Sequence, residues 1–333
     1  MNRRAVYGPR DGTVLSQQTQ HRSDDILDGD LDDVLKARRA DGAFWSHFQQ
    51  HNLPVRVQIL NEIEFYGVYR CGRLVYDCHL ITALVERWRS ETHTFHFRVG
   101  EATITLQDVQ IIWALPIDGE PVTGLDLDRT TIEWQDYCLT YLGFRPAAIA
   151  FKGSTANSCN YIAHSTSRNY VRHTARNCGT VCTCSCVASV GWVMCPDSSG
   201  NLIPLLYLTK LEDIVEARNY SWGSAVLAFL YRELYNATNK GKAAIGGALQ
   251  LLQNVCIWVK SKQIIIVCSQ QHHMVQLGTV STPLPGQYVR VIRDILDEMQ
   301  SDQFIWQPYD LDSDVIMAYA ADFNPSYGDH HVR

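Results

Sequence analysis

The chain has 333 residues, a formal net charge of −6 and a hydrophobic content of 46%, so it is long enough to bury a sizeable core. The acidic balance argues against a duplex-binding module with a basic face, and no apolar run reaches the roughly 18 residues that a membrane-spanning helix needs. The start of the chain lacks the apolar segment expected of a secretory signal, and we interpret the eleven unevenly clustered cysteines as reduced thiols of a nuclear or cytosolic protein.

Residues 1–23 are polar and are expected to form an irregular arm. Beyond the arm, apolar spacing and end signals predict a series of helices. In the first half of the chain they cover residues 27–40, 43–50, 54–64, 78–88, 106–114 and 131–143. Asp77 is a good N-cap for the fourth of these helices. Thr105 and Thr130 each stand three residues before an acidic residue, which is the spacing of a capping box.

Residues 94–106 change from helical to strand periodicity. Phe95, Phe97 and Val99 alternate with polar residues, and a second alternating run follows Gly100-Glu101. Alternation on both sides of a turn predicts a β-hairpin, with the turn at Gly100-Glu101.

The second half of the chain is less regular. Residues 150–186 are rich in Ser, Thr, Asn and Cys and have little apolar periodicity, so a loop or poorly ordered insert is expected. Ser221 is predicted to cap a strong helix. Further elements are predicted as a helix over 243–254, which contains a costly Gly246-Gly247 pair, a short strand over 263–268 and a helix over 288–299. The pattern therefore predicts a mainly α protein, a single helical domain with one β-hairpin at about 94–106 and minor strands.

Three blocks of the chain carry a family resemblance. They run over residues 8–145, which contain the stretch YDCHLITALVERWRSETHTFHFRVGEATITLQDVQIIWALPIDGEPVT, over 195–254, and over 284–309, which contain DQFIWQPY. These blocks resemble the plant mobile domain, also called the aminotransferase-like plant mobile domain. The resemblance implies a domain over 24–310, diverging and poorly ordered at 150–186 and 256–282, with a loose tail over 311–333.

The resemblance also implies a function. Plant mobile domain proteins of the MAINTENANCE OF MERISTEMS and MAIN-like type are nuclear and are implicated in transposon silencing, gene-expression control, genome integrity and meristem maintenance. A non-enzymatic role in protein–protein assembly is therefore expected, with a phosphatase-like partner of the protein phosphatase seven group. The alternatives are a transposon-encoded accessory protein with nucleic-acid affinity, a decayed copy without function, and a cryptic enzyme with a deep pocket of ionisable groups.

One cysteine cluster is a weak candidate for a metal site. Cys178, Cys182, Cys184 and Cys186 lie close together, but their spacing differs from the paired Cys-x-x-Cys of structural zinc sites. An incidental cluster is the favoured interpretation, and no metal is predicted.

Histidines near the hairpin form a second candidate. Glu91, His93 and His96 are close in sequence, but residues three apart on a strand point to opposite faces. They are interpreted as structural. Cys78 and His79 are adjacent and so cannot form a nucleophile–base pair by themselves.

No cofactor is predicted, in spite of the family's name. Pyridoxal phosphate chemistry needs a lysine for its Schiff base, and Lys240 and Lys242 lie in a predicted exposed turn. Gly246-Gly247 lacks the Gly-Lys-Ser/Thr of a phosphate loop. No catalytic residue is therefore assigned.

Aromatic residues suggest one contact surface. Five tryptophans could stack on nucleic-acid bases, but at helical spacing among aliphatic residues they are interpreted as core. They are Trp88, Trp113, Trp134, Trp222 and Trp306. The block around Trp306 mixes polar residues with aromatics in a predicted loop, which favours a partner surface. Its members are Phe304, Trp306, Gln307, Pro308 and Tyr309.

Overall fold

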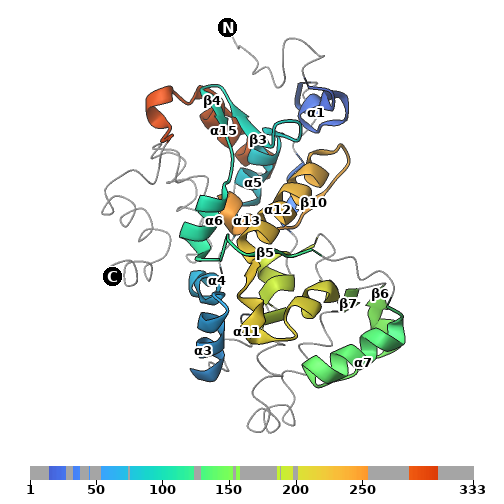
Figure 1. Cartoon of the computed structure of the whole chain (residues 1–333). Coiled ribbons are helices and arrows are strands. Elements are labelled where there is room, and N and C mark those ends of the chain that lie inside the picture. The colour runs from blue at the N-terminus through green and yellow to red at the C-terminus, as the bar shows by residue number, and fades with distance from the viewer. Residues whose placement is uncertain are drawn as a thin grey trace, which may run out of the picture.

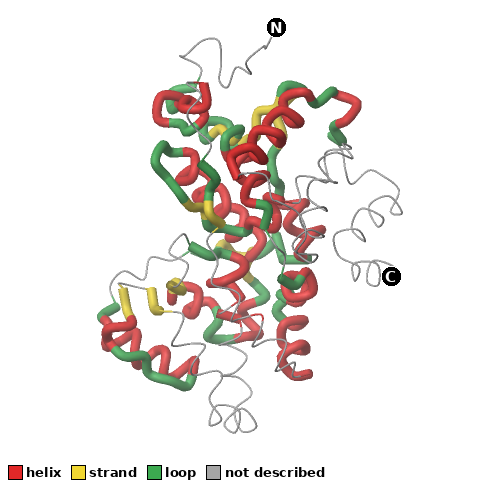
Figure 2. Tube along the Cα trace, turned by 180° about the vertical axis from the view of Figure 1, so that it is seen from behind, coloured by secondary structure: helices red, strands yellow, loops and turns green. Residues whose placement is uncertain are grey.

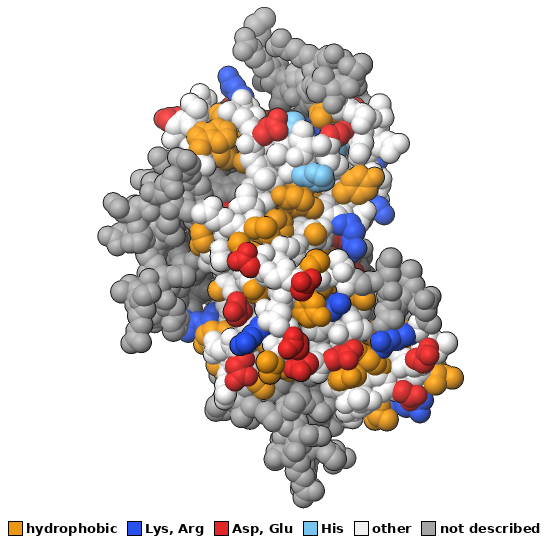
Figure 3. Space-filling view, viewed as in Figure 1, with side chains coloured by type: hydrophobic (Ala, Val, Ile, Leu, Met, Phe, Trp, Pro, Cys, Tyr) orange, Lys and Arg blue, Asp and Glu red, His pale blue; other side chains and the backbone are white. Residues whose placement is uncertain are grey.

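The computed structural model describes residues 15–27, 33–37, 45, 54–73, 76–123, 129–152, 155–157, 186–187, 189–197, 202–253 and 285–306. Within these residues helices dominate and strands are short and scattered (Figures 1 and 2), which confirms the mainly α prediction. No helix in this part of the chain is long and apolar enough to cross a membrane. On the face seen in Figure 3, acidic and basic side chains are interspersed with hydrophobic ones.

The centre of the molecule is built from helices that are far apart in sequence. They are α5 (Cys78–Val85), α6 (Leu106–Trp113), α12 (Trp222–Thr238), α13 (Leu249–Gln253) and α15 (Pro285–Glu298). α12 packs against α5 and α6, while α15 and α13 pack against α5 (Figure 1). Six of the eight residues of α5 are buried, because neighbours cover it on several sides. The tryptophan core is confirmed for Trp88, Trp113, Trp134 and Trp222, which are all fully buried. It is wrong for Trp306, which is half exposed.

The predicted helix starts are largely correct. Asp77 caps α5 by accepting hydrogen bonds from the backbone N–H groups of His79 and Leu80. Complete capping boxes open α6, at Thr105, and α7 (Thr131–Leu142), at Thr130. Ser221 does precede α12, but its hydroxyl donates to Ile117 O and accepts from no backbone N–H of the helix.

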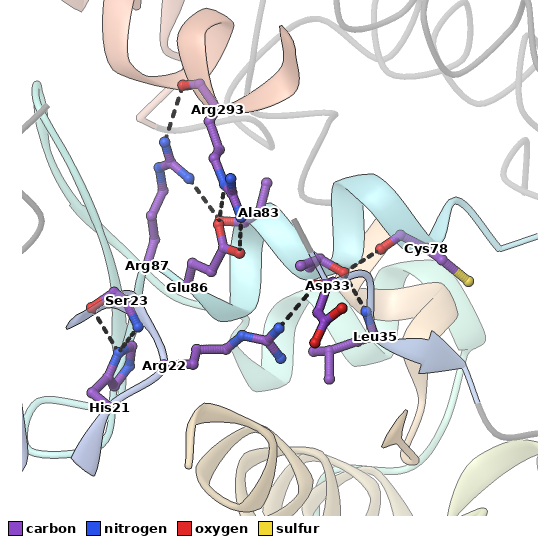
Figure 4. A network of polar contacts seen from close by, with 11 residues as sticks. His21, Arg22, Ser23, Asp33, Leu35, Cys78, Ala83, Glu86, Arg87 and Arg293 are labelled. Carbon is purple, nitrogen blue, oxygen red and sulfur yellow. Dashed lines mark hydrogen bonds and ion pairs between the residues drawn. The ribbon is translucent and has the colours of Figure 1, made fainter. Parts of the chain in front are cut away.

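Two ion pairs, one buried and one partly exposed, hold α15 on the end of α5. Figure 4 shows the buried pair, between Arg293 and Glu86. The guanidinium of Arg293 donates to both carboxylate oxygens of Glu86, at 2.8 and 2.7 Å, and both side chains are buried. Arg87 donates to Asp297 and to the backbone oxygens of Ala83 and Arg293. Because a buried charge is costly without its partner, these contacts favour one position of α15 along α5.

Two predicted helices are wrong in part. Residues 33–37 are not helical, and β1 (Lys36–Ala37) pairs in parallel with β10 (Ala244–Ile245). The helix predicted over 27–40 is therefore absent there, and the helix predicted from residue 243 begins only at α13. The physical reason lies in tertiary contacts, because the Leu35 N–H is satisfied by the hydroxyl of Thr82 on α5.

The glycine pair at 246 and 247 explains why no helix runs through it. A Cβ on Gly246 would lie 2.4 Å from Pro196 O, and Gly247 has a left-handed backbone with φ of 87°. Gly247 N–H also donates to Pro196 O at 2.7 Å. Close approach to residues 196–197 and to Glu233 Oε2, which would lie 2.9 Å from the same Cβ, therefore requires glycine at position 246.

The other elements surround this core. The helical ones are η1 (Gln18–Gln20), α1 (Ser23–Leu27), α3 (Pro54–Glu62), α4 (Tyr66–Cys71), η2 (Ala148–Ala150), η3 (Val190–Met194), η4 (Leu205–Lys210), α11 (Ile214–Ala217) and η6 (Ser301–Gln303). β5 (Glu120–Pro121) pairs with β9 (Tyr220–Ser221). α3 and α15 confirm the helices predicted over 54–64 and 288–299, whereas the strand predicted over 263–268 lies outside the described residues, as does all but Trp45 of the helix predicted over 43–50.

Part of the predicted insert is ordered. β6 (Phe151–Lys152), β7 (Thr155–Asn157) and β8 (Leu202–Pro204) form a three-stranded antiparallel sheet. This sheet lies beside α7 at one end of the molecule (Figure 1). The expected loop over 150–186 is thus wrong for its first residues, and residues 158–185 lie outside the described part.

Candidate functional site

The predicted hairpin is present and belongs to a sheet with two different faces. Its strands are β2 (Trp88–Arg89), β3 (Thr94–Phe97) and β4 (Gly100–Ala102), all antiparallel. The turn is at residues 98–99 and not at Gly100-Glu101, because both of these residues pair with β3. Cross-strand partners share a face, so Arg89, Thr94, His96 and Glu101 lie on one side, which we call the polar face.

The polar face carries a closed set of hydrogen bonds at the surface. The hydroxyl oxygens of Thr92 and Thr94 are 2.6 Å apart, and Thr94 donates to Glu101 Oε2 at 2.9 Å. His96 Nε2 lies 3.2 Å from Thr92 Oγ1 and 3.4 Å from Glu101 Oε2. Burial lowers the pKa of His96, although Glu101 opposes this effect, so the imidazole is neutral at pH 7. Hydroxyl, imidazole and carboxylate groups thus present both donors and acceptors.

The histidines considered as metal ligands do not converge. His93 has a left-handed backbone with φ of 55°, and its ring stacks on Tyr231 at a centroid distance of 5.6 Å. His96 faces Glu101, while Glu91 accepts a hydrogen bond from Gln17 N–H. Across the described residues, no three His, Cys, Asp or Glu side chains are placed to hold a metal ion.

The N-terminal arm covers the buried end of the polar face. Arg89 donates to Gln18 Oε1 at 2.7 Å and to Ser23 Oγ at 3.4 Å. His21 Nε2 lies 2.9 Å from Trp88 O, and its Nδ1 accepts from Ser23 N–H. Burial, aided by the nearby Arg89, lowers the pKa of His21 to about 4. Residues 15–27 are therefore docked on the sheet, which the expected irregular arm did not anticipate.

The opposite face of the sheet is apolar and meets the C-terminal aromatic block. Phe304 is buried, with its ring 5.8 Å from that of Phe97 and 4.4 Å from that of Trp306. Trp306 lies over Gly100 and is 51% exposed. The predicted partner surface therefore contains one core residue, Phe304, and one surface residue, Trp306. Its other members, Gln307, Pro308 and Tyr309, lie outside the described residues.

The remaining candidates are dispersed. Cys186 is buried, and Cys178, Cys182 and Cys184 lie outside the described residues. Cys78 and His79 occupy the first turn of α5, where His79 Nδ1 is 3.5 Å from Asp77 Oδ1. Lys240 forms a half-exposed ion pair with Asp24, in the turn after α12.

Sequence reasoning missed the pairing of His96 with Glu101. Alternation alone places Thr94 and His96 on one face, but the partner across the strands depends on where the hairpin turns. A turn two residues later pairs His96 with a different residue. The site that results is a hydrogen-bonding surface on one face of the sheet and an exposed indole on the other, and the two meet at the edge strand β4. A partner that wraps this edge would contact both.

Comparison with known proteins identifies the family of this chain. The family model described as plant mobile domain matches residues 64–324. Over 91% of this chain, MAIN-LIKE 2 of Arabidopsis thaliana is 31% identical, and over 72% of it MAINTENANCE OF MERISTEMS of the same plant is 34% identical. A third Arabidopsis relative, named serine/threonine-protein phosphatase 7 long form homolog, is 32% identical over 91% of the chain.

The matched regions are only parts of these relatives. They cover 45% of MAIN-LIKE 2, 49% of MAINTENANCE OF MERISTEMS and 23% of the phosphatase 7 long form homolog. No solved structure matches the chain. Because the family model covers well over half of the residues and three relatives exceed 30% identity, this chain belongs to the plant mobile domain family.

Proposed function

We propose that this chain is a non-catalytic, nuclear assembly module that binds a phosphatase of the protein phosphatase seven group. In this role it would serve transposon silencing, gene-expression control, genome integrity and meristem maintenance. One observation carries the proposal. A relative whose name includes a serine/threonine phosphatase aligns with 91% of this chain but over only 23% of its own length.

That arrangement supports a physical association. Within a single polypeptide, two regions are held at a high effective concentration, so even a weak contact between them is formed most of the time. When the same two regions belong to separate chains, the contact must be made by surfaces alone. The name MAINTENANCE OF MERISTEMS, borne by another relative, supports the developmental part of the proposal.

The polar face and Trp306 are the proposed contact surface. Tryptophan is enriched among the residues that dominate binding energy, and it acts best where a rim of polar groups surrounds it. Trp306 is half exposed and is held from below by Phe304 and Gly100. Glu101 follows Gly100 in β4, the edge strand of the sheet, so a partner that wraps this edge from Trp306 also reaches the hydrogen-bonding groups of Thr94, His96 and Glu101.

The test is affinity purification of the tagged chain from plant nuclei, with mass spectrometry of the proteins that co-purify. We expect a phosphatase of the seven group to be recovered with the wild-type chain and lost with Trp306→Ala. Tyr235→Ala is the matched control, because Tyr235 is also a half-exposed aromatic residue but lies on α12. Co-purification of other proteins without a phosphatase would contradict the proposal. Salt-dependent binding of the chain to DNA would also contradict it.

A further inference from the structure

Strand β4 is the outer strand of the hairpin sheet. The strands are ordered β2-β3-β4, so among the described residues β4 is paired on one side only. Figure 1 shows β4 at the periphery of the molecule. An edge strand presents main-chain N–H and C=O groups that can pair with another chain. The register of the hairpin identifies the residue that presents them.

The main chain of Glu101 faces outward from the sheet. His96 N–H donates to Arg87 O at 2.9 Å, toward β2. In an antiparallel strand the N–H and C=O of one residue point to the same side, and those of its neighbours point to the other. His96 therefore directs no main-chain group toward β4. Glu101 is its cross-strand partner, so the N–H and C=O of Glu101 point away from β3, and no residue in the described part of the chain pairs with them there.

The two faces of β4 offer different chemistry to a strand that pairs with it. Glu101 lies on the polar face, its side chain is 51% exposed, and no described lysine or arginine forms an ion pair with it. Gly100 and Ala102 lie on the apolar face, where the half-exposed Trp306 covers Gly100. A residue added opposite Glu101 would share the polar face, and its two neighbours would lie on the apolar face.

We propose that β4 binds an extended segment of a partner protein in which a lysine or arginine stands between two apolar residues. The segment adds a fourth strand to the sheet. Its basic residue exchanges two main-chain hydrogen bonds with Glu101, and its side chain meets the Glu101 carboxylate. The apolar residue opposite Gly100 packs on Trp306. Strand addition of this kind takes affinity from the main chain and specificity from alternate side chains.

The segment is expected to belong to the phosphatase partner proposed above, and to that extent the inference rests on the proposed function. The carboxylate of Glu101 selects a basic residue against an acidic one, because like charges across an interface are unfavourable. A strand of three residues offers few main-chain hydrogen bonds, so a short peptide alone should bind weakly.

A pair of N-methylated peptides tests the strand pairing. The probe is an acetylated and amidated peptide of sequence TVRVT, and its binding to the full chain is measured by NMR titration. We expect saturable binding that shifts the amide signal of Glu101. N-methylation of the arginine removes the donor to Glu101 O and should weaken binding about tenfold or more. N-methylation of the following valine, whose N–H points away from β4, is the matched control and should change the affinity little.

Charge reversal tests the side-chain contact. Glu101→Lys should lose affinity for TVRVT and gain affinity for the peptide TVEVT. Glu120→Lys is the matched control, because Glu120 is also exposed but lies on β5, and it should bind both peptides like wild type. An absence of TVRVT binding would overturn the proposal, as would equal effects of the two N-methyl groups or a wild-type chain that prefers TVEVT.

The peptide titration and the purification from nuclei fail independently. If a phosphatase is recovered in a Trp306-dependent manner but TVRVT does not bind, the phosphatase contact stands and strand addition is wrong. If TVRVT binds as expected but no phosphatase is recovered, strand addition stands and the segment belongs to a different protein.

Discussion

Arg293 and Glu86 are 207 positions apart, yet the guanidinium of one donates to both carboxylate oxygens of the other in the protein interior. Bidentate pairing of this kind fixes direction as well as distance. It therefore positions the whole of α15 on α5. η6 and Phe304 follow α15 in the chain, so the same contact also determines where Trp306 meets the hairpin.

Arg293→Met should destabilise the fold by about 3–5 kcal/mol, because it leaves the Glu86 carboxylate buried without its partner. Chemical denaturation measures the loss. The double variant Glu86→Leu with Arg293→Met should cost much less than Arg293→Met alone, since it removes both charges together.

Lys240→Met is the control for this experiment, because its ion pair with Asp24 is partly exposed and should contribute about 0–1 kcal/mol. An Arg293→Met variant that loses no more stability than Lys240→Met would show that the Arg293–Glu86 contact does not hold α15.

Local signals in the sequence predicted the helices well and their partners poorly. The capping boxes at Thr105 and Thr130 act within four residues, and both helices begin where predicted. The non-helical segment at 33–37 contains Leu35, whose N–H donates to Thr82, some 47 residues away, and no local pattern reveals that contact. Long-range contacts of this kind override helix propensity.

Gly100→Ala should destabilise the protein by about 1–3 kcal/mol and displace Trp306 from the hairpin. A Cβ at this position would lie 2.4 Å from the indole ring. Denaturation gives the cost. In a Trp306→Ala background the same substitution should cost less, because the ring that it strikes is gone.

Gly241→Ala separates steric collision from backbone strain. Gly241 also has a positive φ, of 78°, but a Cβ added there would meet nothing within 4 Å. Gly241→Ala should cost only the free energy of holding a side chain at a positive φ. This cost should be the same in the wild-type and Trp306→Ala backgrounds. Equal costs for Gly100→Ala with and without Trp306 would disprove the contact.

The candidate site was predictable only in part. Alternation in residues 94–99 revealed the apolar face, and Phe95 and Phe97 are indeed buried. The polar face needed the correct register, and that depends on a turn at 98–99 without a strong turn dipeptide. The exposure of Trp306 and the burial of Phe304 follow from the position of α15, which local sequence does not encode.

Glu233→Gln should make the protein more stable at neutral pH. Burial raises the pKa of Glu233, whose carboxylate accepts from Gly246 N–H at 3.2 Å. A raised carboxyl pKa contributes stability that is present below the unfolded pKa of about 4.3 and is lost as pH rises through the folded pKa. Glutamine keeps an acceptor for Gly246 and carries no charge.

Unfolding free energies of both proteins across pH 4 to 8 test this expectation. The advantage of Glu233→Gln should grow with pH, by about 1.4 kcal/mol for each unit by which the pKa is raised. Glu120→Gln, at an exposed carboxylate, provides the control. A Glu233→Gln advantage that is constant across this range would contradict a raised pKa.

His21→Asn should weaken docking of the N-terminal arm in a pH-dependent way. In the folded protein His21 Nδ1 accepts from Ser23 N–H and Nε2 faces Trp88 O, so the neutral ring with a proton on Nε2 satisfies both contacts. A second proton on Nδ1 would remove the acceptor for Ser23 and face Arg89. The lowered pKa, about 4, therefore stabilises the fold above the unfolded value near 6.5, and this stability is lost as pH falls toward 4.

At pH 8 we expect His21→Asn to cost about 1–2 kcal/mol, since asparagine retains one of the two hydrogen bonds. The difference in unfolding free energy between wild type and His21→Asn should narrow as pH falls from 6.5 to 4. Only the wild-type protein loses the stability that the neutral His21 ring contributes. Denaturation at stepped pH measures the two curves, and His93→Asn, at an exposed histidine, provides the control. Curves for wild type and His21→Asn that remain parallel down to pH 4 would show that the proton equilibrium of His21 is not linked to folding.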